Sequence, residues 1–273
     1  MALGVQEPGV APAPTRPVPA LAVGLLAQFA VLVALAAGVG LGALGWLAAT
    51  GYALATWALL GRAVSKPEAH RWGPADTVTL SRATLVGGVT ALVVESLTAP
   101  VPVAVVVALA SVALVLDAVD GHVARRTRTS ALGARFDMEI DSVLVLVLSV
   151  FVAGSLGWWV VAIGGFRYAF GVAGWALPWL RAPLPVLLSR KAVAAMQGIV
   201  LVVASAGLLP RPLALGLVGL SLALLCWSFG RDIAWLWRRR HQDAGQDVGQ
   251  HARQQARHEA RQVEVSPQEA TIG

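Results

Sequence analysis

The chain has 273 residues, of which 57% are hydrophobic and only 13% carry a charged side chain. Soluble globular proteins average roughly 25% charged residues, so this composition excludes a soluble domain and indicates an integral membrane protein. The formal net charge of +6 is attributed to Arg and Lys in cytoplasmic loops, and a nucleic-acid partner is not expected. The lone Cys226 lies within an apolar run, which rules out an intramolecular disulfide and predicts a buried thiol.

The N-terminal part of the chain divides into a tail, two apolar runs and a connector. Residues 1–19 are rich in Pro and Ala, which predicts a disordered tail. Two runs within 20–63, at about 20–38 and 42–63, are each long enough for a transmembrane helix. The first run is too long for the apolar part of a signal peptide, so we expect it to be retained. The polar segment 64–76 is expected to lie at the membrane surface.

Six more apolar runs follow, and each predicts a spanning helix. The fold class expected is therefore all-α, a polytopic membrane bundle of about eight transmembrane helices. The polar, Gln-rich segment 237–273 is expected to be a cytoplasmic tail, solvated or a frayed helix. The six runs cover about 77–97, 101–125, 133–153, 157–180, 191–208 and 212–236.

Loop charge predicts the orientation of the chain. The connectors near 39–41, 98–100 and 154–156 lack Lys and Arg, whereas the alternate connectors carry them. By the positive-inside rule, both termini and the segment 117–141 face the cytoplasm at the cell membrane, with Arg211 as the exception. The basic residues behind this prediction are Arg62, Lys66, Arg71, Arg125, Arg126, Arg128, Arg135, Arg181, Arg190, Lys191, Arg238, Arg239 and Arg240.

Four aspartates recur with helical spacing at the ends of two of these runs. Asp117 and Asp120 are three residues apart, and Asp137 and Asp141 are four apart. Residues at this spacing share a helix face. Charges at the end of a membrane-spanning run are costly to bury and are functional candidates by default. Small residues on the same two faces leave room for a ligand: Gly121, Ala124 and Gly133.

These aspartates predict a metal site. Two helices joined by a short loop can bring the two faces together, and four carboxylates in one pocket repel one another unless cations neutralise them. Ligation by oxygen alone suits Mg²⁺ or Mn²⁺ rather than zinc. Two such ions about 3.5–4 Å apart form the clamp used for in-line displacement at phosphorus. The loop arginines 125, 126 and 128 suit phosphate oxygens; alternatively, they pair with the aspartates and only set the topology.

The segment from 117 to 141 closely resembles the signature of the CDP-alcohol phosphotransferases, in the pattern Asp117-x-x-Asp120-Gly121-x-x-Ala124-Arg125 … Gly133-x-x-x-Asp137-x-x-x-Asp141. The resemblance implies a six-helix membrane core, here about 77–236, to which the two helices of 20–63 are an addition. The loop between the Arg and the second Gly is one residue shorter than is usual in the family.

The resemblance implies an enzyme of phospholipid biosynthesis. It would transfer a phosphoalcohol group, most simply a phosphatidyl group, from CDP-diacylglycerol or another CDP-alcohol to an alcohol acceptor, with release of CMP. Asp117, Asp120 and Asp137 would hold two Mg²⁺ or Mn²⁺ ions. Asp141 would be a further metal ligand and the base that takes the proton of the acceptor hydroxyl. Further substrate contacts would come from Gly121, Ala124, Arg125, Ser130 and Gly133.

Two more features are candidates for substrate contacts. The run D-T-V-T-L-S-R at 76–82 resembles a family pattern, with Asp in place of Asn, which implies that Thr79 and Arg82 point into the site. The alternative for Arg82 is that it extends to the membrane interface. Arg190 and Lys191 suit the phosphate of an acceptor, and anchoring by the positive-inside rule explains them equally well.

Two rival functions stay open. A cation transporter would also use metal-linked aspartates, although transporter sites usually lie near the bilayer midplane. A non-catalytic scaffold on the same fold is the second rival, because the signature loop is short. The expected partners are the CDP-alcohol, an unidentified alcohol and membrane lipid, and a homodimer is a possible assembly. Arg167, which lies within an apolar run, is expected to pair with a carboxylate in the bundle.

Overall fold

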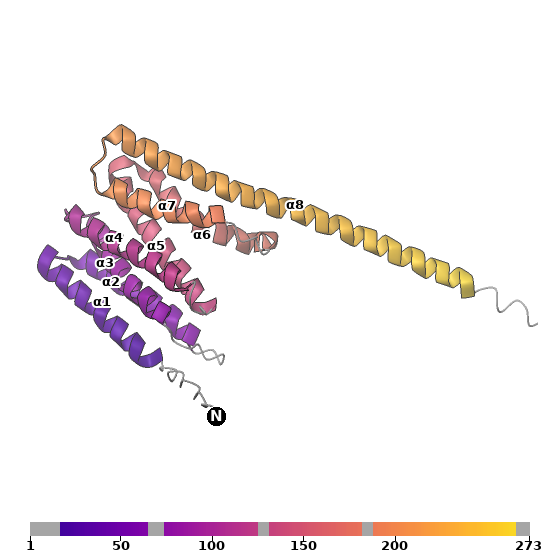
Figure 1. The fold of residues 1–273 in the computed structure, drawn as a ribbon, viewed down its shortest axis with the longest axis horizontal. Coiled ribbons are helices and arrows are strands. Elements are labelled where there is room, and N and C mark those ends of the chain that lie inside the picture. Colours follow the sequence, from indigo (N-terminus) through magenta and orange to yellow (C-terminus); the bar gives the residue numbers. More distant parts are fainter. Residues whose placement is uncertain (1–16, 65–73, 125–130, 182–187, 266–273) are drawn as a thin grey trace, which may run out of the picture. The chain divides into compact units, whose positions relative to one another are not determined.

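A computed structural model describes residues 17–64, 74–124, 131–181 and 188–265. Within these ranges the chain forms eight α-helices and two 3-10 turns, with no strand, which confirms the all-α class expected (Figure 1). The elements are α1 Pro17–Val39, α2 Ala43–Val64, α3 Pro74–Glu95, α4 Val103–Ala124, α5 Ala131–Leu156, η1 Trp158–Val160, α6 Val161–Ala176, η2 Pro178–Arg181, α7 Leu188–Ser205 and α8 Arg211–Val265.

Five of the described helices are long and apolar enough to cross a membrane. This finding, together with the helical content, confirms a multi-pass membrane bundle. The five segments are Ala22–Val39, Ala43–Gly61, Thr77–Glu95, Phe136–Leu156 and Arg211–Arg240, and two shorter apolar helices are Val103–Val119 and Ala192–Ser205.

Two helices differ in length from the predicted runs. The run predicted at 157–180 contains α6, which has only 16 residues, between the two 3-10 turns. Gly157 precedes it at φ +113°, a conformation that only glycine adopts without strain. Pro178, which lacks a backbone N–H, follows its C-terminal end. At the other extreme, α8 continues as one helix of 55 residues to Val265.

The chain divides into two compact units. One contains residues 1–167 and 194–222, and the other contains residues 168–193 and 223–273. Within the first unit, α3 packs against α1, α2, α4 and α5. Its buried positions include Val86, Val89 and Leu92, none of which is exposed. Because α3 contacts four other helices, its side chains connect the N-terminal helices with α4 and α5.

Two hydrogen bonds attach α2 to α3, and α1 packs closely against α3 at a glycine. The Tyr52 hydroxyl on α2 donates a hydrogen bond of 2.9 Å to the carbonyl oxygen of Ala83. At the other end of α3, the buried Glu95 carboxylate accepts a hydrogen bond of 2.9 Å from the backbone N–H of Gly45. Gly87 on α3 lies directly against the Gln28 side chain of α1, and a Cβ at that position would overlap it. The small residue is therefore what allows the close approach.

A side-chain ion pair joins α5 to α6. Arg167 Nη2 lies 2.6 Å from Glu139 Oε1. The expectation that Arg167 pairs with a carboxylate of the bundle is therefore confirmed. Since Glu139 lies between Asp137 and Asp141 in the chain but pairs with α6, the carboxylates of α5 divide between two different faces of that helix.

Cys226 is exposed, so the expectation of a buried thiol was wrong. The physical reason is that an apolar run in a membrane protein does not distinguish its lipid-facing side from its packed side. Neighbouring residues on α8 illustrate this: Leu220 and Trp227 are 60% and 59% exposed, whereas Leu225 is buried.

Candidate active site

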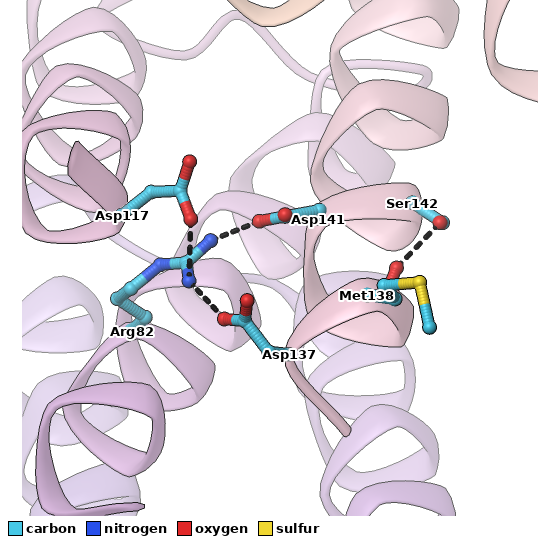
Figure 2. A network of polar contacts seen from close by, with 6 residues as sticks. All are labelled: Arg82, Asp117, Asp137, Met138, Asp141 and Ser142. Atoms are coloured by element: carbon cyan, nitrogen blue, oxygen red, sulfur yellow. Dashed lines mark hydrogen bonds and ion pairs between the residues drawn. The ribbon is translucent and has the colours of Figure 1, made fainter. Parts of the chain in front are cut away.

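Arg82 is the centre of the candidate site. Its side chain is fully buried and contacts three aspartates, Asp117 on α4 and Asp137 and Asp141 on α5 (Figure 2). Nη1 lies 2.9 Å from Asp117 Oδ1 and also contacts Asp137 Oδ1, while Nη2 contacts Asp141 Oδ1. One guanidinium group from α3 thus joins the carboxylates of two neighbouring helices.

The local helices explain why these carboxylates meet. Asp137 and Asp141 are one turn apart on α5, so their side chains leave the helix on the same face. Asp117 lies near the C-terminal end of α4, and both helices pack against the α3 helix that carries Arg82. The sequence pattern predicted the two faces, and the packing brings the three carboxylates that are described together.

Burial differs between the two kinds of charge. The Arg82 side chain is 0% exposed, whereas the side chains of Asp117 and Asp137 are 34% exposed and that of Asp141 is 40% exposed. The guanidinium therefore lies beneath the carboxylates, which form the accessible side of the cluster. An ion or a substrate that reaches the cluster meets the carboxylates first.

The three aspartates have the chemistry of a site for a hard divalent cation. One carboxylate oxygen from each of Asp117, Asp137 and Asp141 can be chosen so that the three lie within 4.8 Å of one another. Oxygen donors from carboxylates are the ligands that Mg²⁺ and Mn²⁺ prefer. The described cluster thus contains three carboxylates and one guanidinium, so acidic groups outnumber basic ones within it. The residues present therefore fit a divalent metal.

Neighbouring polar side chains do not all join this cluster. Ser142 follows Asp141 in the chain, but its hydroxyl donates a hydrogen bond of 2.6 Å to the carbonyl oxygen of Met138 on its own helix (Figure 2). Thr79 is buried on α3, one turn before Arg82 and on the same face of the helix. The position of Thr79 is thus compatible with the contact that the sequence pattern implied.

The other predicted site residues lie at or beyond the edges of the described part. Asp120, Gly121 and Ala124 belong to the end of α4, and Gly133 belongs to the start of α5, but their side-chain surroundings are not described. Arg125 and Ser130 fall in the range 125–130, outside the described residues. Arg190 and Lys191 are in the first turn of α7, again without described side chains.

The central position of Arg82 among the carboxylates went beyond the sequence prediction. The sequence indicated an arginine turned toward the site as a substrate contact, but it did not indicate that the arginine pairs with three aspartates. The available signal was an arginine two turns inside an apolar helix. The alternative in which the aspartates pair with the loop arginines falls on residues outside those described, and each of the three aspartates contacts Arg82.

Comparison with known proteins identifies the family. The family model described as CDP-alcohol phosphatidyltransferase matches residues 72–228, more than half of the chain. The matched range includes α3, α4 and α5 with the whole carboxylate cluster, and it begins after α1 and α2. Searches of curated proteins and of solved structures gave no match. On the family match, the chain belongs to the CDP-alcohol phosphatidyltransferase family.

Proposed function

We propose that this protein transfers a phosphatidyl group from CDP-diacylglycerol to an alcohol acceptor, releasing CMP, in phospholipid biosynthesis. Membership of the family supports the coarser activity, a phosphotransferase that uses a CDP-alcohol and an alcohol acceptor. The observation that carries the finer proposal is the cluster of Asp117, Asp137 and Asp141 within the family-matched range of an apolar helical bundle. A cluster carried by apolar, membrane-grade helices supports a donor that is linked to lipid.

In this proposal Asp117, Asp120, Asp137 and Asp141 hold two divalent ions, Mg²⁺ or Mn²⁺. Members of the family typically use a divalent metal, and the oxygen donors of the described aspartates suit one. When bound, the ions neutralise the pyrophosphate of the donor and stabilise the departing CMP as an anion.

Asp141 is the proposed base. Of the three described carboxylates it is the most exposed, at 40%, so a hydroxyl group can approach it. The acceptor oxygen attacks the β-phosphorus of the donor, its proton passes to the Asp141 carboxylate, and the bond from that phosphorus to the oxygen of CMP breaks. Asp137 lies one turn before Asp141 on α5 and holds metal in the same pocket.

The remaining predicted residues bind the substrates. Arg82 and Thr79 are close enough on α3 to contact the donor phosphates together. The nucleotide would lie against the ends of α4 and α5 and the loop between them, and the phosphate of an acceptor against the start of α7. The residues proposed for these contacts are Gly121, Ala124, Arg125, Ser130, Gly133, Arg190 and Lys191.

The site is proposed to open toward the cytoplasm of the cell membrane, as loop charge indicates. Labelling of single cysteines tests this orientation, and Cys226 must first be changed to Ser because it is exposed. On that background Arg128→Cys should react only from the cytoplasmic side, and Ala99→Cys only from outside. The reverse pattern would place the site away from cytoplasmic CDP donors and would contradict the proposal.

The direct test of the function is identification of the product. Purified protein in detergent is given Mg²⁺, CDP-diacylglycerol and one of glycerol phosphate, inositol phosphate, serine or diacylglycerol, and the lipids are analysed by mass spectrometry. We expect one new phosphodiester with an equal amount of CMP, and none with Asp137→Asn. Absence of CMP release with every acceptor, in Mg²⁺ and in Mn²⁺, would favour the scaffold alternative.

A further inference from the structure

Arg82 is a positive charge that is fully buried at the point where the proposed function requires metal ions. We propose that Arg82 is a resident counter-ion of the metal-free protein, and that divalent ions displace its guanidinium from the aspartates when they bind. The displaced group then turns to the phosphates of the donor. This inference rests on the proposed function, because it concerns the regulation of the same site.

The first argument is electrostatic. Three carboxylates that are only 34–40% exposed and share one pocket repel one another. Without a cation, α4 and α5 would have to separate or the aspartates would have to take up protons. The guanidinium contacts all three aspartates at once and so permits the assembled pocket to exist before any metal arrives.

The second argument is competition for the same ligands. Arg82 uses Nη1 for Asp117 and Asp137 and Nη2 for Asp141, so its contacts go to all three candidate metal ligands that are described. A divalent ion on those carboxylates would lie within a few ångströms of the guanidinium, and like charges at that distance disfavour each other. Occupation by metal and occupation by Arg82 are therefore opposed.

The third argument is an unsatisfied donor. Arg82 Nε is buried and has no hydrogen-bond partner among the described residues, although the guanidinium can donate five hydrogen bonds. A buried donor without a partner is unfavourable, so this contact geometry is not optimal for the arginine. Phosphate oxygens accept paired hydrogen bonds from Nε and Nη, so a donor pyrophosphate offers the arginine a better arrangement.

The opposite hypothesis is that Arg82 stays on the aspartates in every state and holds them in place for the metal. The two hypotheses predict opposite signs for the effect of Arg82 on metal affinity. If the guanidinium competes with the metal, its removal strengthens metal binding. If it holds the ligands in place, its removal weakens metal binding. Affinity for the metal alone therefore decides between them, with no need for turnover.

The experiment is a titration of metal-free, detergent-purified protein with Mn²⁺, followed by electron paramagnetic resonance of free Mn²⁺. Arg82→Gln removes the charge and keeps a polar side chain, and Arg82→Lys keeps the charge. We expect Arg82→Gln to bind Mn²⁺ roughly tenfold more tightly than the unchanged protein, and Arg82→Lys to stay near it. Glu139→Gln is the matched control, because Glu139 pairs with Arg167 outside the cluster, and it should leave Mn²⁺ binding unchanged.

Thermal unfolding gives a second readout. Without metal, Arg82→Gln should unfold at a lower temperature than the unchanged protein. Saturating Mn²⁺ should raise the unfolding temperature of Arg82→Gln by more than it raises that of the unchanged protein. Equal or weaker Mn²⁺ binding by Arg82→Gln would overturn the inference, and so would a variant that stays unfolded even in saturating Mn²⁺. An unchanged protein that binds no Mn²⁺ would instead overturn the metal site of the proposed function, and the inference with it.

Discussion

Helix α3 holds two buried charges, Arg82 about two turns from its start and Glu95 at its C-terminal end, and their partners differ. Arg82 is 0% exposed and Glu95 is 8% exposed, and about 20 Å of helix separates them at 1.5 Å per residue. Glu95 accepts a hydrogen bond from the backbone N–H of Gly45 at the start of α2, where the helix dipole favours a negative charge. Arg82 instead contacts three side chains that are partly exposed.

The comparison teaches how to separate structure from function among buried charges. The backbone N–H that holds Glu95 is fixed, so this contact can only attach α2 to α3. The carboxylates around Arg82 are accessible to other cations, so their partner can be exchanged. Both residues are buried, so burial does not distinguish them. Only Arg82 has accessible partners, and this accessibility identifies it as part of a candidate site.

The largest expected effect on activity comes from the carboxylates around Arg82. Asp141→Asn should fold and bind CDP-diacylglycerol but lose transfer by roughly 10²–10⁴-fold, because it removes the proposed general base. Donor affinity and turnover are measured on the same purified variant, with Glu139→Gln from the same helix as the control. Near-normal turnover would exclude Asp141 as the base, and lost donor binding would make it mainly a metal ligand.

A smaller effect, on stability alone, is expected at the Glu95 end. A Cβ on Gly42 would lie 2.5 Å from Glu95 Oε1. Gly42→Ala should therefore displace the Glu95 carboxylate from the Gly45 N–H and lower the free energy of unfolding by about 1–3 kcal/mol, as loss of a hydrogen bond to a buried charge does. Gly38→Ala is the control, since no atom of the described residues lies within 4 Å of a Cβ there. A Gly42→Ala variant that is as stable as the unchanged protein in a denaturant titration would show that α2 does not depend on this close approach.

The smallest effect expected is that of Glu95→Gln. The amide keeps an oxygen that can accept from the Gly45 N–H but loses the charge, so the free energy of unfolding should fall by about 1 kcal/mol. Turnover at saturating substrates should not change, because Glu95 is far from the cluster. A loss of turnover comparable to that of Asp141→Asn would show that Glu95 is not purely structural and would contradict the distinction drawn between Glu95 and Arg82.

The sequence predicted the helical features that depend on local periodicity. Apolar runs gave the helices, and spacings of three and four residues gave the faces on which Asp117, Asp137 and Asp141 lie. The family resemblance predicted the family, and the match of the family model over residues 72–228 confirms it. Each of these properties depends on residues within a few helical turns of one another, so it can be predicted from one sequence.

The features that escaped prediction depend on packing between distant segments. Glu95 bonds to a backbone group 50 residues earlier, and Arg82 contacts aspartates 55 and 59 residues later in addition to Asp117. Hydropathy also cannot tell a lipid-facing position from a packed one, and the exposed Cys226 is the example. Local periodicity does not contain this information, because helix rotation is set by neighbouring helices.

The most direct test of the central claim is the metal dependence of CMP release by the unchanged protein. The claim is that the aspartate cluster around Arg82 performs a metal-dependent transfer from a CDP-linked donor. CMP formed from CDP-diacylglycerol and the accepted alcohol is measured before chelation, in EDTA, and after Mg²⁺ or Mn²⁺ is restored. The account predicts that release stops in EDTA and returns with either ion. Full release in the presence of the chelator would contradict it.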